Sequence, residues 1–155
     1  MAQTWASIDF EIVEAASLSL LMLVSTTAFH YEALRFLGRV SNGHRISRRW
    51  TVLILAALVG AHLAEVALYA GAYAFGANVL SLGGLSGTLG RAALDFFYFA
   101  AETYSTLGYG DLVPIGALRL IASVESLNGL LLLSWSGAFL YGVLREPVTR
   151  TGTHL

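Results

Sequence analysis

Three long apolar stretches dominate the hydrophobic pattern of the chain. They run from about residue 12 to 36, from 50 to 75 and from 116 to 144. A helix needs about 20 mostly apolar residues to cross the hydrocarbon layer of a bilayer, and each stretch exceeds that length. The pattern therefore predicts an all-α membrane protein with three transmembrane helices.

The segment between the second and third apolar stretches has a different pattern. Residues 76–90 are rich in glycine and too polar to span, and residues 91–105 form a short amphipathic stretch, RAALDFFYFAAETYS. About 15 residues suit a re-entrant helix better than a full span. We therefore expect an extracellular loop over 76–90, then a short helix over 91–105 that enters the membrane and turns back.

Composition supports a membrane protein and argues against a soluble enzyme. Only 12% of the residues are charged and 56% are hydrophobic, whereas a soluble domain carries about 25% charged residues. A net charge of −1 lacks the excess of positive charge that is typical of proteins that bind nucleic acid. Because the chain has no cysteine, thiolate catalysis and cysteine-based metal sites are excluded. No local hydrolase motif is present, so we do not expect an enzyme.

The arginines predict the orientation in the cell membrane. Five of them surround the connection between the first two helices, and two more follow the third helix: Arg35, Arg39, Arg45, Arg48, Arg49, Arg145 and Arg150. Cytoplasmic loops carry the excess of positive charge. We therefore expect residues 1–49 to form an N-terminal helix and a basic cytoplasmic loop, residues 147–155 to form a short cytoplasmic tail, and the N-terminus to lie outside.

A cleaved signal peptide is the alternative for the first stretch. Such a peptide has a positively charged start and a short apolar core. Here the first residues carry Asp9, Glu11 and Glu14 without any Lys or Arg, and the apolar run is long. A retained transmembrane helix therefore fits better.

The most informative motif follows the predicted short helix. Residues 102–114 read ETYSTLGYGDLVP, and their centre is TLGYGD at 106–111. This centre resembles the TVGYG selectivity filter of potassium channels. The chain resembles the pore-domain family of prokaryotic channels with two transmembrane helices, here with an extra N-terminal helix. The resemblance implies a pore domain over 50–146, with outer helix 50–75, pore helix 91–105, filter 106–111 and inner helix 116–144.

The resemblance implies that backbone carbonyls bind the permeant ion. Hard cations take oxygen ligands, and carbonyls of Thr106, Leu107, Gly108 and Tyr109, with Gly110, would replace the hydration shell of K⁺. Glycine permits the backbone angles that aim successive carbonyls inward. Leu107 stands where Val or Ile is usual. The resemblance implies that its backbone carbonyl, and not its side chain, binds the ion. No cofactor is expected, since K⁺ is the permeant ion.

One chain supplies one such loop, and a closed ring needs four. A homotetramer in membrane lipid, in which each chain has three identical partners, is the simplest solution. The expected function is passive, potassium-selective conduction. A weakly selective cation channel and a non-conducting accessory or structural subunit are the alternatives.

Two carboxyl groups, Glu102 and Asp111, flank the filter motif. In some potassium channels a Glu and an Asp at these positions share a proton behind the filter, and two close carboxylates would raise one pKa. Alternatively, Asp111 is solvated at the outer mouth and Glu102 bonds only to backbone amides. We also expect Tyr109 to point away from the pore and to pack against the short helix.

Polar side chains also occur inside the second and third predicted helices. His62 and Glu65 lie three residues apart, as do Glu125 and Asn128, so each pair shares a helix face. Glu65 and Glu125 are at similar predicted depth, which suggests one polar cluster of all four residues. Asn128 facing a central cavity, and hydrogen-bonded packing without a gating role, are alternatives.

Gly129 is the best hinge candidate of the third predicted helix, because it lies nearest the middle of that helix. Close helix packing is the alternative function of such a glycine. On the first predicted helix, His30 lies near the inner end, where we expect an interfacial position.

Overall fold

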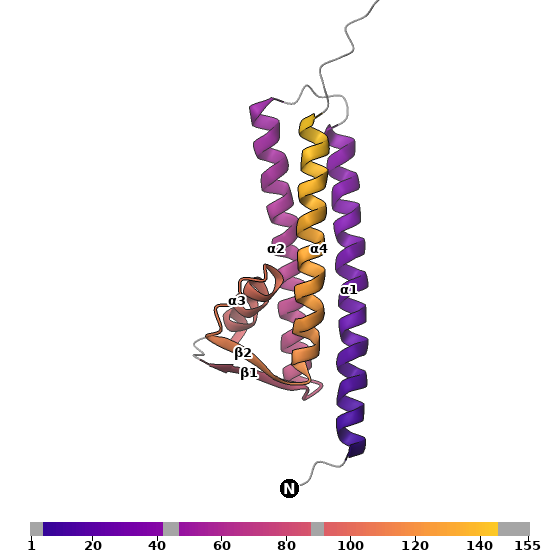
Figure 1. Ribbon diagram of the computed structural model, residues 1–155, viewed down its shortest axis with the longest axis vertical. Helices are drawn as coiled ribbons and strands as arrows, with labels where there is room; N and C mark the ends of the chain where they lie inside the picture. Colours follow the sequence, from indigo (N-terminus) through magenta and orange to yellow (C-terminus); the bar gives the residue numbers. More distant parts are fainter. Residues whose placement is uncertain (1–4, 42–46, 88–91, 146–155) are drawn as a thin grey trace, which may run out of the picture.

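The computed structural model describes residues 5–41, 47–87 and 92–145 (Figure 1). The elements follow the order α1 (Trp5–Ser41), α2 (Arg48–Asn78), β1 (Gly83–Gly87), α3 (Ala92–Tyr104), β2 (Leu112–Gly116) and α4 (Leu118–Arg145). The predicted tail at 147–155 lies outside the described residues, as does the middle of the arginine-rich connection.

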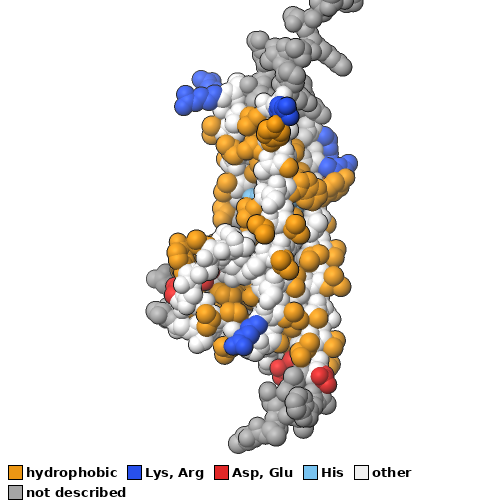
Figure 2. Space-filling model, in the orientation of Figure 1, with side chains coloured by type: hydrophobic (Ala, Val, Ile, Leu, Met, Phe, Trp, Pro, Cys, Tyr) orange, Lys and Arg blue, Asp and Glu red, His pale blue; other side chains and the backbone are white. Residues whose placement is uncertain are grey.

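Three helices are long and apolar enough to cross a membrane, which confirms the main prediction from the hydrophobic pattern. They are Asp9–Ser41, Arg48–Asn78 and Leu118–Arg145. Large apolar side chains such as Leu20, Leu68 and Leu131 are exposed on their outer faces, and Figure 2 shows hydrophobic side chains along the whole length of the bundle. Such surfaces suit contact with lipid or with other subunits.

The glycine-rich segment contains a short strand, which corrects the expectation of a loop over 76–90 in an otherwise mostly helical fold. β1 pairs antiparallel with β2, with Gly83 opposite Gly116 and Gly87 opposite Leu112. Gly83 and Gly87 have φ angles of 124° and 136°. A Cβ on Gly83 would collide with the carbonyl of Ile115 in β2, and a Cβ on Gly87 would collide with the carbonyl of Asp111, just before β2. Glycine is therefore required at both positions by close backbone approach.

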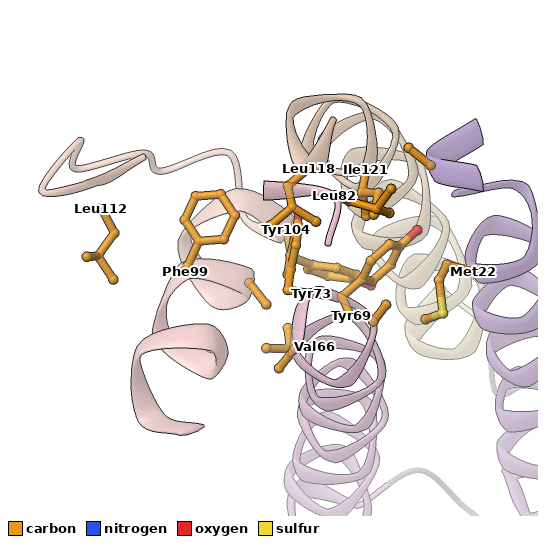
Figure 3. Packing of buried hydrophobic residues seen from close by; sticks show 14 of the residues in the cluster. Met22, Val66, Tyr69, Tyr73, Leu82, Phe99, Tyr104, Leu112, Leu118 and Ile121 are labelled. Carbon is orange, nitrogen blue, oxygen red and sulfur yellow. The ribbon is translucent and has the colours of Figure 1, made fainter. Parts of the chain in front are cut away.

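The short helix α3 lies beside one end of the bundle. Figure 1 shows α3 and the two strands next to the end where α2 finishes and α4 begins. Buried rings hold α3 in place: Phe99 meets the ring of Tyr73 edge-on, with 5.0 Å between centroids, and Tyr104 is buried with them (Figure 3). This packing determines where the chain leaves α3 and enters the TLGYGD motif.

The additional helix α1 packs along α4 and α2 within the same subunit. Its buried positions recur every three or four residues: Ala15, Ser19, Met22, Thr26, His30, Leu34 and Leu37. This spacing is one face of an α-helix. Because that face carries Ser, Thr and His, α1 meets its neighbours through polar as well as apolar contacts.

Candidate functional site

The TLGYGD motif forms an exposed loop between α3 and β2. Thr106, Gly108 and Gly110 have φ angles of 59°, 55° and 81°, whereas Leu107 and Tyr109, between them, are not among the positive-φ residues. A positive φ at every second residue can turn successive carbonyls toward the same side, unlike a β-strand, where successive carbonyls point in opposite directions. The loop can therefore present a row of oxygens.

Thr106 adopts a conformation that a β-branched residue rarely has. A left-handed backbone costs a non-glycine residue about 1–2 kcal/mol, and such outliers cluster at functional sites. The amide of Thr106 donates to the carbonyl of Thr103 at 3.0 Å. The amide of Leu107 donates to the carbonyl of Glu102 at 2.8 Å. The carbonyls at the end of α3 thus hold the start of the loop.

The Glu102 side chain supports the middle of the loop from behind. Glu102 is 4% exposed, and its carboxyl accepts a hydrogen bond of 3.1 Å from the amide of Tyr109. Burial raises the pKa of Glu102; the hydrogen bond opposes that rise and the charge of Asp111 adds to it. The direction agrees with the expected carboxyl pair, although the sharing of a proton stays a prediction.

Asp111 and Tyr109 are held from the side by the helix α3. The Tyr98 hydroxyl donates to both carboxylate oxygens of Asp111, at 3.1 and 3.3 Å. The Tyr98 ring stacks on that of Tyr109, with 6.5 Å between centroids and 5° between planes. The Tyr109 ring therefore packs against α3, in the direction predicted from the motif.

The four predicted intramembrane polar residues do not form one cluster. Glu125 accepts a hydrogen bond from the hydroxyl of Tyr73, whereas His62 lies level with Ser136, with 2.9 Å between its Nε2 and Oγ of Ser136. Tyr73 and Glu65 are 8 residues apart on α2, which places them about 12 Å apart along the helix axis. Glu65 is therefore deeper than Glu125, and the prediction of similar depth was wrong.

Asn128 joins three helices instead of facing a cavity. Its amide donates to Oγ1 of Thr26 at 2.6 Å and to the hydroxyl of Tyr69 at 3.1 Å. Asn128 is 3% exposed. The alternative in which its dipole serves a passing ion is therefore wrong, and its observed contacts fasten α1 to α2 and α4.

Gly129 of α4 lies directly against Tyr104 at the end of α3. A Cβ at this position would collide with the carbonyl oxygen of Tyr104. Close packing of α4 against the end of α3 thus explains why this residue is glycine. Its function as a hinge stays a prediction.

The position of His30 was predicted wrongly. His30 is fully buried, and its Nδ1 lies 2.9 Å from Oε1 of Glu65. The missed signal was its place on the buried face of α1, four residues after Thr26 and four before Leu34. Residues that share a helix face share an environment, so this spacing already favoured burial.

The pore region matches a known family. Residues 50–146 match the family described as Ion channel. Over 99 residues the chain is 32% identical to the inward rectifier potassium channel Kirbac3.1 of Paramagnetospirillum magnetotacticum, an alignment that covers 63% of this chain and 32% of that protein. The chain thus spans about a third of the length of this relative. No solved structure matches the chain. Helix α1 precedes the region matched by the family.

Proposed function

Because the chain belongs to the ion channel family, we propose that it forms a potassium-selective channel in which main-chain carbonyls from Thr106 to Gly110 bind the permeant ion. The observation that carries this proposal is the alternation of φ along the loop, positive at Thr106, Gly108 and Gly110. The similarity to a potassium channel supports the choice of ion.

Potassium must lose its water to pass a narrow pore, and oxygen ligands must replace that water. Carbonyl oxygens do so without fixed negative charge, so the ion binds and still leaves. One loop offers carbonyls on one side only. Irregular backbone persists at membrane depth where protein buries it or water lines it. The exposed loop therefore fits a ring of four identical subunits, in which four loops surround one axis.

The charge distribution supports an orientation for this channel. Figure 2 shows the arginines mainly at the end where α1 finishes and α4 ends, and acidic side chains at the opposite end. Positive charge favours the cytoplasmic side. The C-terminus is then cytoplasmic, the N-terminus outside, and α3 with its loop occupies the outer half of the membrane.

Potassium flux from purified protein in liposomes tests this function. We expect the protein to migrate as a tetramer in detergent and to release K⁺ from loaded vesicles. Equal release of Na⁺ would favour a weakly selective cation channel. A tetramer without any flux across a range of pH and voltage would favour an accessory or structural subunit.

The titration of Glu102 makes the stability of the assembly depend on pH. Burial raises the folded-state pKa of this carboxyl above its ordinary value of 4.5, so the folded protein holds the proton more tightly than the unfolded chain. This contribution to stability is complete below pH 4.5 and is lost as the pH rises through the raised pKa. We expect the thermal midpoint to fall across that window, and Glu102→Gln to remove that fall.

Glu32→Gln is the matched control for this measurement. Glu32 is 59% exposed and pairs with Arg35 on the surface of α1, so its replacement leaves the fall in place. Identical pH profiles for wild type and Glu102→Gln would show that Glu102 does not carry the effect.

A further inference from the structure

Four side chains from three helices converge in the interior at a place the proposed conduction path does not use. His30 comes from α1, His62 and Glu65 come from α2, and Tyr104 ends α3. We call these four residues the His-Glu cluster. The ligand atoms of His30, His62 and Glu65 all lie within 4.8 Å of one another. His30 and Glu65 are fully buried, and the His62 side chain is 14% exposed.

The Nδ1 atoms of both imidazoles point at the same carboxylate. His30 Nδ1 lies 2.9 Å from Oε1 of Glu65, and His62 Nδ1 lies 3.1 Å from Oε2. The hydroxyl of Tyr104 lies 2.8 Å from His62 Nδ1 and donates to Oε2 of Glu65. Two nitrogens and two kinds of oxygen thus surround one point, with a donor set that suits a borderline cation.

The Nε2 atoms of both imidazoles point at a single hydroxyl on α4. Ser136 Oγ lies 2.9 Å from Nε2 of His62 and 3.3 Å from Nε2 of His30. If both imidazoles are neutral and donate through Nδ1 to Glu65, the one hydroxyl proton of Ser136 serves only one Nε2. The lone pair on the second Nε2 then faces the Ser136 oxygen with no proton between the two atoms.

A cation on the Nδ1 side selects one and the same tautomer for both imidazoles. Each imidazole then carries its proton on Nε2, and the two lone pairs of Ser136 Oγ accept both N–H groups. Metal-bound histidines usually donate their other N–H to such a partner, which fixes the tautomer and the ring orientation. Without a cation the Glu65 carboxylate has His30, His62 and Tyr104 within hydrogen-bond distance; a bound cation would add a full positive charge beside it.

We propose that the His-Glu cluster is a Zn²⁺ site, with His30 Nδ1, His62 Nδ1 and the Glu65 carboxylate as ligands and the Tyr104 hydroxyl at the fourth position. Zinc takes imidazole nitrogen and carboxylate oxygen in tetrahedral sites, whereas Ca²⁺ and Mg²⁺ prefer oxygen alone.

The bound ion would join α1 to the support of the TLGYGD loop. Tyr104 ends α3 only two residues before Thr106, and His30 lies on the helix outside the family match. Zinc would therefore stabilise the position of α1 against the end of α3. The site does not depend on which ion the channel conducts.

Metal content of the purified, untagged full-length protein tests the site. After incubation with ZnCl₂ and removal of free metal, we expect one zinc per chain and a raised thermal midpoint. X-ray absorption at the zinc edge should show two imidazole nitrogens at about 2.0–2.1 Å. Glu65→Gln and His30→Gln should each lose the ion.

Two further variants separate a metal site from general damage. His154→Gln removes a histidine from outside the cluster and should keep one zinc per chain. Ser136→Ala keeps every ligand but removes the acceptor of both Nε2–H groups, so zinc affinity should fall about 10–100-fold. If wild-type protein retains no zinc, or if the bound zinc has no imidazole ligand, the cluster is a proton-holding network and the proposal is wrong. The wild-type result decides this even if Glu65→Gln does not fold.

Discussion

Replacing Gly108 with alanine is expected to abolish potassium flux without preventing membrane insertion. The φ angle of Gly108 is 55°, which costs an L-residue about 1–2 kcal/mol. The cost recurs in each of the four proposed subunits, about 4–8 kcal/mol per ring. Since about 1.4 kcal/mol is a factor of ten, the intact ring becomes about 10³-fold rarer or more. Liposome flux measures the loss.

Gly71→Ala is the matched control for this substitution. Gly71 is an exposed residue of α2 without a positive φ, and a Cβ there meets no atom within 4 Å. Flux through this variant should equal that of wild type. Normal flux through Gly108→Ala would mean that the left-handed conformation at this position is not needed for conduction.

Gly129→Ala is expected to lower the stability of the protein and its potassium flux together. The added Cβ meets the carbonyl of Tyr104, a backbone atom that cannot rotate away. Overpacking of this kind costs about 1–3 kcal/mol at each site, so the thermal midpoint should fall by about 5 °C or more. The end of α3 would shift, and the start of the TLGYGD loop would shift with it.

Gly137→Ala on the same helix distinguishes packing from a hinge. A Cβ on Gly137 meets no atom within 4 Å, and alanine in a helix is favoured over glycine by about 0.5–1 kcal/mol. Its thermal midpoint should therefore be unchanged or higher. If Gly129→Ala keeps the wild-type midpoint but changes only gating, the close contact with Tyr104 is not what requires glycine, and the hinge hypothesis is favoured.

The spanning helices and the candidate ion loop could be predicted because their signals are local. A run of about 20 apolar residues indicates a transmembrane helix by itself. The glycines at positions 108 and 110 are explained by the backbone angles of those same positions. The positive φ of Thr106 could not be predicted from the sequence, because threonine rarely adopts such an angle.

The two-stranded sheet and the arrangement of the polar groups depend on distant parts of the chain. β1 and β2 pair across α3 and are only five residues long each. β1 is rich in glycine and β2 contains Pro114, so neither strand shows the alternation of a half-buried strand. Relative depth depends on where each helix begins and ends. α2 runs three residues past its predicted end, and α4 starts at Leu118, so counting from predicted ends misaligned Glu65 with Glu125.

The reversal potential of the reconstituted protein tests the central claim most directly. Under a tenfold potassium gradient balanced by sodium, carbonyl rings that select K⁺ predict a reversal potential near the potassium equilibrium value, about 59 mV from zero. A potential close to zero under the same gradient would show that sodium passes equally well, and would contradict a potassium-selective ring of carbonyls from Thr106 to Gly110.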